Sequence, residues 1–180
     1  GRIQTLQGWL ARRRGDFAQA ETMLQKSVAI LQELEDRGLL AQAWLQWGYL
    51  HQAQGNWDRA ETAFRQASEL RLALGERHLA IEPQAGLTAV YHHTGNLAKA
   101  AETAEPVINF LVEKSANGTD ETLQIYLSCY QVLVAVKDGR LSQIQQRAKD
   151  LLQQRASTIQ DASDQATYLQ AIPAHAEIQT

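Results

Sequence analysis

One short pattern returns four times along the chain: a glycine, then a polar residue, then a large apolar residue. The glycines lie 40, 40 and 44 residues apart, at Gly15, Gly55, Gly95 and Gly139. The apolar residues two positions later are Phe17, Trp57, Leu97 and Leu141. Self-similarity at a fixed period of this size indicates a repeat architecture, in which each unit packs mainly against its neighbours.

The residues between the glycines have the spacing of amphipathic helices. Apolar side chains recur three and four positions apart, as in Leu24, Val28 and Leu31, and the alternation typical of strands is nowhere convincing. We therefore predict that each unit is a helix, a glycine turn and a second helix. The glycine can end the first helix in a left-handed conformation. The Asp or Asn that follows it can cap the second helix.

Small residues recur at matching positions in the units. Gly8 and Gly48 lie in first helices, and Ala20, Ala60 and Ala100 lie early in second helices. A glycine inside a helix costs about 0.5–1 kcal/mol relative to alanine, so packing must offset that cost. We expect the facing small residues to let two backbones approach closely. We also expect the large residue after each turn to fill the wedge between the two helices.

These features resemble the tetratricopeptide repeat from Arg2 to about Arg155. The resemblance is weakest in the fourth unit, where Val132 and Ile144 replace small residues. The usual repeat has about 34 residues, so a longer period adds most of a turn to each helix. The resemblance implies an all-α fold of antiparallel helix pairs, an α-solenoid with a right-handed superhelix. The expected units are about 1–36, 37–76, 77–118 and 119–160, followed by a short C-terminal capping helix and tail over 161–180.

Four short motifs in the second half resemble, in their order, the C-terminal end of large multidomain bacterial proteins. They are IEPQAGL (81–87), NGTDET (117–122), YLSCYQVL (126–133) and AIPAHAEI (171–178). In that family a signalling ATPase core precedes a tetratricopeptide array. The resemblance implies that this chain is the C-terminal array of a bacterial signalling ATPase or transcriptional regulator, with any nucleotide site outside it. Ala176 stands where that family usually has Arg.

Two prolines fall within the predicted helices of the third unit. Pro83 is tolerated near a helix start and would kink the helix further in. Pro106 removes a backbone hydrogen bond from the second helix, so we expect a bend near Ala104, either as a static kink or as a hinge. Gly118 is expected to end that helix.

Composition and charge argue against nucleic-acid binding, membrane spanning and disulfide formation. The net charge of -3 argues weakly against nucleic-acid binding. No apolar run approaches the roughly 20 residues that span a bilayer. The single Cys129 cannot form an internal disulfide, so we expect a cytoplasmic location and a buried, unreactive thiol. The chain begins at Gly1 with a helical pattern already under way, so we expect it to be a piece of a longer protein.

No catalytic, cofactor-binding or metal-binding constellation is predicted. The sequence contains no G-x-x-x-x-G-K phosphate loop. His92 and His93 are adjacent and would point about 100° apart on a helix. The run Arg12, Arg13 and Arg14 has two interpretations that stay open. Its positive charges could be stabilised by the negative, C-terminal end of the helix dipole, or they could contact an anionic partner.

In a solenoid of helix pairs, the first helix of each pair lines the concave surface. Residues three and four positions apart share a helix face. The predicted lining is Arg2, Thr5, Trp9, Arg12, Gln42, Leu45, Tyr49, Gln52, Ala89 and His92, with Glu82 and Ala85 on the same face of the third unit. The matching stripe of the fourth unit is apolar and is expected to be buried under the tail or a neighbour; it comprises Tyr126, Cys129, Leu133 and Val136.

Aromatic residues beside arginine are typical of interface hot spots. Trp9 and Tyr49 could equally pack between neighbouring repeats, and both interpretations stay open. A groove of the carboxylate-clamp type, with paired Lys and Asn, is not supported because Trp9 and Tyr49 stand where its asparagines would be.

We therefore predict a non-enzymatic protein–protein interaction or scaffold domain. Its partner would be a protein, a peptide or another domain of its own parent chain. The alternative is an effector-sensing domain that binds a small molecule or peptide in the concave groove and controls a parent ATPase or regulator. Self-association through the end repeats is also open. No cofactor, nucleic-acid partner or membrane partner is expected.

Overall fold

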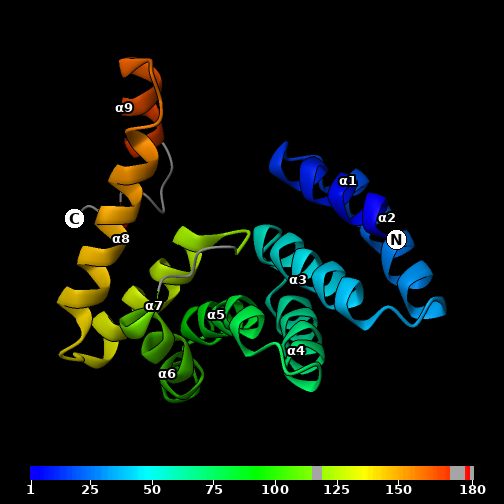
Figure 1. Ribbon diagram of the computed structural model, residues 1–180. Helices are drawn as coiled ribbons and strands as arrows, with labels where there is room; N and C mark the ends of the chain where they lie inside the picture. Colours follow the sequence, from blue (N-terminus) through cyan, green and yellow to red (C-terminus); the bar gives the residue numbers. More distant parts are fainter. Residues whose placement is uncertain (115–118, 171–176, 179–180) are drawn as a thin grey trace.

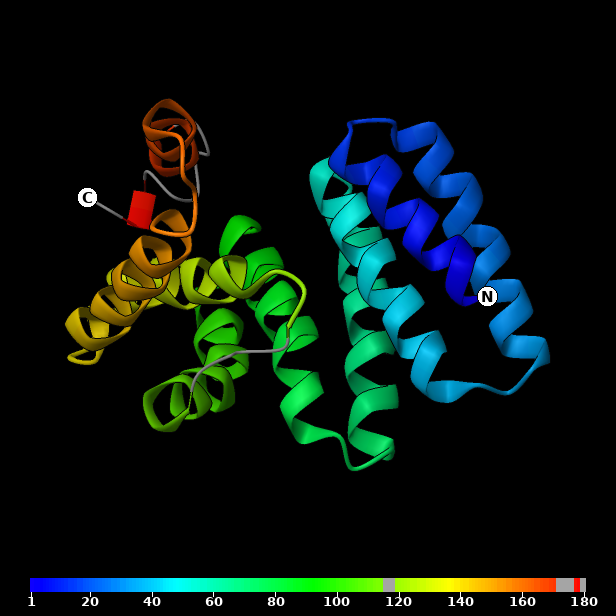
Figure 2. The same cartoon turned by 45° about the horizontal axis from the view of Figure 1, so that its top comes forward.

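The computed structural model describes residues 1–114, 119–170 and 177–178, and every element of the first two ranges is a helix. The helices are α1 (Arg2–Arg13), α2 (Phe17–Glu33), α3 (Arg37–Ala53), α4 (Trp57–Ala73), α5 (Arg77–His93), α6 (Leu97–Glu113), α7 (Thr122–Val136), α8 (Leu141–Ala156) and α9 (Ala162–Gln170). Figures 1 and 2 show α1 to α4 on one side of the molecule, α6 to α9 on the other, and α5 between them. The all-α solenoid predicted from the repeat is confirmed.

The first three glycine turns form as the sequence predicts. Gly15, Gly55 and Gly95 have φ angles of 79°, 73° and 78°, a left-handed conformation that glycine adopts at little cost. The fourth turn differs, because Gly139 is not among the residues with positive φ. There α7 ends at Val136, and Lys137 takes the left-handed conformation with φ 56°. The fourth turn therefore spans residues 137–140, whereas the first spans 14–16.

Two of the three predicted caps form, at Asp16 and Asn96, and Asp36 supplies a further cap that the glycine pattern did not predict. Asp16, Asp36 and Asn96 each accept a hydrogen bond from the backbone N–H three residues ahead, at 3.0, 3.0 and 3.2 Å. Asn56 does not cap α4, because its side-chain amide donates instead to Gln54 Oε1. Three of these four helix starts thus gain a side-chain partner for an otherwise free N–H.

The glycines of the first helices allow close packing, but the residue that fills the wedge was predicted wrongly. A Cβ atom built on Gly8 would lie 2.6 Å from Leu24 Cγ, and one on Gly48 would lie 2.5 Å from Phe64 Cδ1. The glycines therefore make room for side chains in the middle of α2 and α4. These side chains stand two turns further along the second helix than the sequence analysis assumed.

The large residues that directly follow the turns have other surroundings. Trp57 stacks on His93, with ring centroids 3.8 Å apart and planes inclined by 22°. Leu97 is 41% exposed. Phe17 and Trp57 are partly buried and pack against core clusters, but the side chains that lie against the glycines are those of Leu24 and Phe64.

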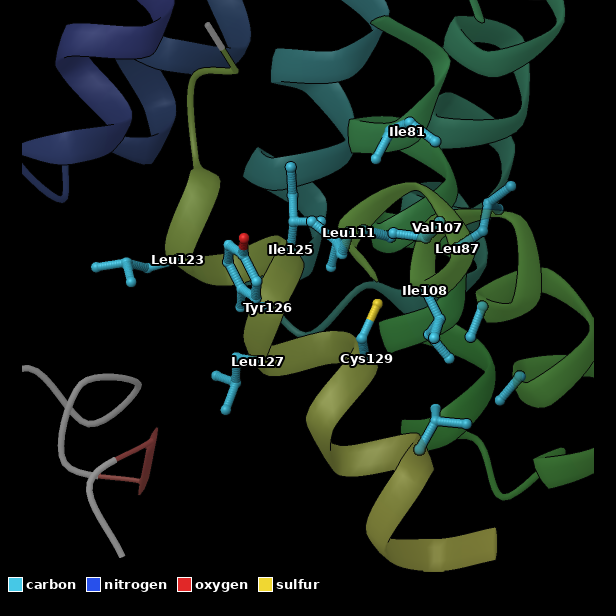
Figure 3. Close-up of a cluster of buried hydrophobic side chains, with 14 of the residues drawn as sticks. Ile81, Leu87, Val107, Ile108, Leu111, Leu123, Ile125, Tyr126, Leu127 and Cys129 are labelled. Carbon is cyan, nitrogen blue, oxygen red and sulfur yellow. The ribbon is translucent and has the colours of Figure 1, made fainter. Parts of the chain in front are cut away.

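The largest hydrophobic core runs from α3 to α8 and includes Ile178 near the end of the chain. Figure 3 shows Ile125 and Cys129 on the side of α7 that faces Ile108 and Leu111 of α6. The predicted apolar stripe of α7 is thus buried at Tyr126, Cys129 and Leu133, whereas Val136 is exposed. Side chains of α5 and α6 contribute to the core that covers it.

Both prolines lie inside continuous helices. The helix α5 extends from Arg77 to His93 across Pro83, and α6 extends from Leu97 to Glu113 across Pro106. Neither proline ends its helix. The prediction that Gly118 ends α6 is wrong, because this helix ends at Glu113 and the backbone is already extended at Lys114. Most of the motif over 171–178 lies outside the described residues. Within the described part of the chain, no helix is long and apolar enough to cross a membrane.

Candidate functional site

The start of α7 reaches across the molecule and lies against α1, α3 and α5 (Figure 1). We call residues 119–122 the acidic segment, because they include Asp120 and Glu121. They are far in sequence from their contacts, which involve α1 and α3 of the first two repeats. The acidic segment therefore lies on the surface that the first helices were predicted to line.

A buried carboxylate on α5 holds the backbone of the acidic segment. Glu82 is 4% exposed and accepts hydrogen bonds from the backbone N–H groups of Asp120 at 3.0 Å and Glu121 at 2.9 Å. The hydroxyl of Tyr49 donates to the same carboxylate at 3.0 Å. Because the first N–H groups of a helix lack partners within the helix, Glu82 supplies an acceptor for the start of α7.

Burial raises the pKa of Glu82 to about 7, although the two backbone donors and Tyr49 lower it. Burial also raises the pKa of Tyr49, and the nearby charges of Glu82 and Glu121 raise it further. The Tyr49 hydroxyl therefore stays protonated and remains a donor. The charge of Glu82 therefore changes near neutral pH.

The side chain of Asp120 binds amides of α3. Its Oδ2 atom accepts hydrogen bonds from Gln42 and, at 2.7 Å, from Gln46. The side-chain amide oxygen of Gln42, Oε1, accepts a hydrogen bond from Arg71 Nη2 at 3.2 Å. Two glutamines one helical turn apart on α3 thus orient one carboxylate, and an arginine of α4 orients the first glutamine.

The side chain of Glu121 binds arginines of α1. Arg12 Nη2 donates to Glu121 Oε1 at 2.7 Å, and Arg13 Nη1 lies 3.4 Å from both carboxylate oxygens. The Arg12 and Glu121 side chains are only 12% and 18% exposed, whereas Arg13 is 55% exposed. The Arg12 guanidinium also lies over the Tyr49 ring, 5.3 Å from its centroid. Arg12 is therefore held from two sides and is largely buried, whereas Arg13 makes longer contacts with Glu121 from an exposed position.

These residues border a hollow of about 440 Å³, which we call the main hollow. Its lining comes from α1, α3, the start of α7, α8 and α9, and comprises Trp9, Arg12, Arg13, Tyr49, Gln52, Ala53, Asp120, Glu121, Thr122, Leu123, Gln124, Arg155 and Tyr168. Arg155 donates to the Thr122 hydroxyl at 2.9 Å. The hollow thus combines three guanidinium groups with aromatic rings, a composition suited to binding polypeptide.

Four of the residues that the sequence assigned to the concave surface line the main hollow: Trp9, Arg12, Tyr49 and Gln52. Three others, Arg2, Thr5 and Gln42, line a second hollow of about 430 Å³ beside Asp36 and Arg71. The structure therefore divides the predicted surface into two hollows.

The remaining assigned residues lie elsewhere. Leu45 and Ala89 are buried in the core, as is Ala85. His92 is half-buried near the end of α5 and lines neither of the two hollows. Leu45, Ala85 and Ala89 are buried and line neither hollow, so this part of the first-helix face serves packing.

Sequence reasoning did not assign several contact residues, among them Asp120, Glu121, Gln46 and Arg155. The motif NGTDET pointed to residues 117–122, but only by resemblance, and no periodicity indicates where a loop will dock. One signal was present at Glu82, an acidic residue within an otherwise apolar helical segment. A buried carboxylate needs hydrogen-bond donors, and that requirement alone predicts a polar partner nearby.

Metal binding and thiol chemistry gain no support from the described residues. Within them, no group of three or more His, Cys, Asp and Glu side chains could hold a metal ion. Cys129 is fully buried, and burial raises the pKa of its thiol to about 12. The prediction of a buried thiol is confirmed.

Comparison with solved structures supports the same fold. The crystal structure of BtubC (BKLC) from P. vanneervenii superposes with a TM-score of 0.66 at 16% identity, over 96% of this chain and 70% of that chain. At this identity the likeness concerns the fold alone. No curated protein matches the chain. Family models described as tetratricopeptide repeat match residues 1–26 and 39–110. Residues 1–26 and 39–110 therefore have the sequence pattern of tetratricopeptide repeats.

Proposed function

We propose that this domain is a non-enzymatic interaction module that binds a segment of a protein partner in the main hollow. One observation carries the proposal: this surface already holds a polypeptide segment. Glu82 binds its backbone N–H groups, while Gln46 and Arg12 bind its acidic side chains. Tetratricopeptide repeats bind proteins and peptides in general, and the acidic segment indicates which surface of this chain is suited to it.

The main hollow has the size and composition that the proposal needs. Its volume of about 440 Å³ falls in the range of ligand sites, roughly 300–1,000 Å³. Trp9 lies half-exposed at its edge, with the Arg13 guanidinium 6.0 Å from its ring centroid. Trp and Arg are enriched among the interface residues that contribute most of the binding free energy. A partner that covers Trp9 and Arg13 would bury side chains of this kind.

An affinity-capture experiment with two matched variants tests the proposal. The site variant combines Trp9→Ala with Arg13→Glu, and the control variant combines Leu72→Ala with Arg77→Glu. Leu72 and Arg77 are exposed and flank the turn between α4 and α5, outside the main hollow. Both variants lose an apolar side chain and reverse one charge, and circular dichroism verifies that both are folded.

We expect the wild-type domain and the control variant to capture the same protein from a lysate, and the site variant to lose it at least tenfold. Equal capture by the site variant would refute binding in the main hollow.

We further propose a cellular context, which rests on the order of the four sequence motifs in the second half of the chain. The domain would be the C-terminal array of a larger cytoplasmic bacterial signalling protein, and its partner could be another domain of that protein. Deletion of the array from the parent is expected to change the output of the parent. An unchanged output would remove this part of the proposal.

Effector sensing remains the second candidate, because the volume of the main hollow also suits a small molecule. A ligand that binds only the folded state raises the melting temperature. A thermal-shift screen of metabolites and short peptides therefore tests it, and the site variant should abolish any shift.

Self-association has its own supporting observation. Ile3, Leu6 and Leu10 form an exposed apolar stripe on α1. Their counterparts 40 residues later, Ala43, Gln46 and Leu50, are buried. Sedimentation of the wild-type domain and of a Leu6→Glu variant tests whether a second copy covers this stripe.

A further inference from the structure

We propose that Glu121 is an internal competitor for the main hollow, and that the partner is an acidic protein segment whose carboxylate replaces that of Glu121 at Arg12 and Arg13. This inference rests on the proposed function and specifies the chemistry of the partner. In the free protein Glu121 occupies the position; in the complex the partner occupies it.

The contacts of Glu121 are of the kind that a second carboxylate can reproduce. Its carboxylate binds Arg12 and approaches Arg13 through side-chain atoms alone. Its backbone N–H is bound separately, by Glu82. The side chain can therefore rotate away from Arg12 while the backbone of the acidic segment stays in place. Release of this side chain does not require α7 to leave the core.

The hollow also has more cationic donors than its own acids use. The Nε atom of Arg12 is buried and has no hydrogen-bond partner among the described residues. Arg155 donates to the Thr122 hydroxyl, and none of the ion pairs found in the described part of the chain includes it. Buried guanidinium groups bind carboxylates strongly. A partner with two or more carboxylates would accept hydrogen bonds from guanidinium donors of Arg12 and Arg155 that do not bind Glu121.

Asp120 does not share this role. Its carboxylate is bound by the amides of Gln42 and Gln46 on α3, and amides carry no net charge. Asp120 positions the segment, whereas Glu121 screens the arginines. The proposal therefore predicts different outcomes for Glu121→Gln and for Asp120→Asn in binding.

The expected size of the effect follows from tethering. A group attached by a short linker competes at an effective concentration in the millimolar range. If the tethered carboxylate holds Arg12 in about nine molecules of ten, removing it raises the apparent affinity for an acidic segment about tenfold. A merely structural pair would behave differently: Glu121→Gln would lower stability and leave the affinity unchanged.

Fluorescence polarisation with a labelled hexaglutamate peptide tests the proposal on the whole chain. A labelled hexaglutamine peptide serves as the neutral probe. The matched control variant is Glu105→Gln, because Glu105 forms an exposed pair with Arg140 at 2.8 Å outside the main hollow. Both variants remove one negative charge, so the control measures the effect of net charge alone. Arg12→Gln is combined with Glu121→Gln as the loss-of-site variant, and thermal melts verify folding.

We expect Glu121→Gln to bind hexaglutamate about tenfold more tightly than the wild-type domain or Glu105→Gln. The gain should disappear on addition of Arg12→Gln, and hexaglutamine should not distinguish the proteins. The proposal is overturned if Glu121→Gln binds hexaglutamate no more tightly than Glu105→Gln, or if neither binds.

This failure is distinguishable from failure of the proposed function. If the peptide result is negative but Trp9→Ala/Arg13→Glu still abolishes capture of a partner, the hollow binds protein by other chemistry. If that site variant captures the partner normally, the proposed function itself is wrong.

Discussion

The close packing of helix pairs predicts that Gly48→Ala destabilises the domain, although alanine is the better helix former. A Cβ atom at residue 48 would lie 2.5 Å from Phe64 Cδ1 and Cε1, and one at Gly86 would lie 2.6 Å from Phe64 Cε1. The fully buried Phe64 ring of α4 is thus held between glycines of α3 and α5. It cannot move away from one without approaching the other.

The magnitude follows from two opposing effects. Overpacking a well-packed core costs about 1–3 kcal/mol. Replacing an interior helix glycine by alanine gains about 0.5–1 kcal/mol. We therefore expect Gly48→Ala to lower the free energy of unfolding by about 1–2 kcal/mol. Urea denaturation at 25 °C, followed by circular dichroism, measures this change.

Two comparisons make the result decisive. Gly38→Ala, in the first turn of α3, would meet only Asp36 Oδ1 at 3.8 Å, so it should be neutral or stabilising by up to about 1 kcal/mol. In a Phe64→Leu background the ring is absent, and Gly48→Ala should lose most of its cost. If Gly48→Ala stabilised the wild-type domain as Gly38→Ala does, the packing argument would be refuted.

Three further predictions concern stability and reactivity. Since burial raises the pKa of Glu82 from 4.5 to about 7, the free energy of unfolding should fall by up to about 3 kcal/mol as pH rises from 4.5 to 7 and then level off. Urea melts across this range should show the fall in the wild-type domain and not in Glu82→Gln. Arg147 donates to the carbonyls of Leu111 and Val112, both at 2.6 Å, at the end of α6. Arg147→Met should therefore cost about 1–3 kcal/mol in a denaturation assay. The Cys129 thiol should not react with a disulfide reagent at pH 8 until the protein is unfolded, and rapid native-state labelling would contradict its burial.

The sequence predicted the helices because their determinants are local. A glycine such as Gly55 can end a helix with positive φ whatever its distant neighbours are, and an Asp such as Asp16 caps its own helix. The fourth turn departed from the pattern for an equally local reason. Asp138 binds the backbone N–H of Arg140 at 2.8 Å, and this turn places the left-handed residue at Lys137.

The packing partners were harder to predict than the helices. The wedge residue was assigned to Trp57, whereas Phe64 fills it. Helical spacing identifies which face of a helix is buried, but not the residue along the helix at which a neighbouring helix comes closest. That position depends on tertiary geometry that no local pattern encodes.

The candidate site was predicted in part. Trp9 and Arg12 line the main hollow as expected from the helix face, and Tyr49 borders it. The contact between Arg12 and Glu121 joins residues 109 positions apart. No repeat periodicity relates such residues, since the acidic segment lies in a connection that interrupts the period. Long-range docking of a loop becomes visible only in the folded chain.

Site-specific photocrosslinking tests the proposed binding surface at the level of single residues. The photoreactive residue p-benzoylphenylalanine would replace Gln52, which lines the main hollow, or Gln66, which is exposed on α4 outside it. After capture from a lysate and irradiation, we predict a crosslinked partner polypeptide from position 52 and none from position 66. A crosslink of equal yield from position 66, or none from position 52 with the partner still captured, would contradict binding in the main hollow.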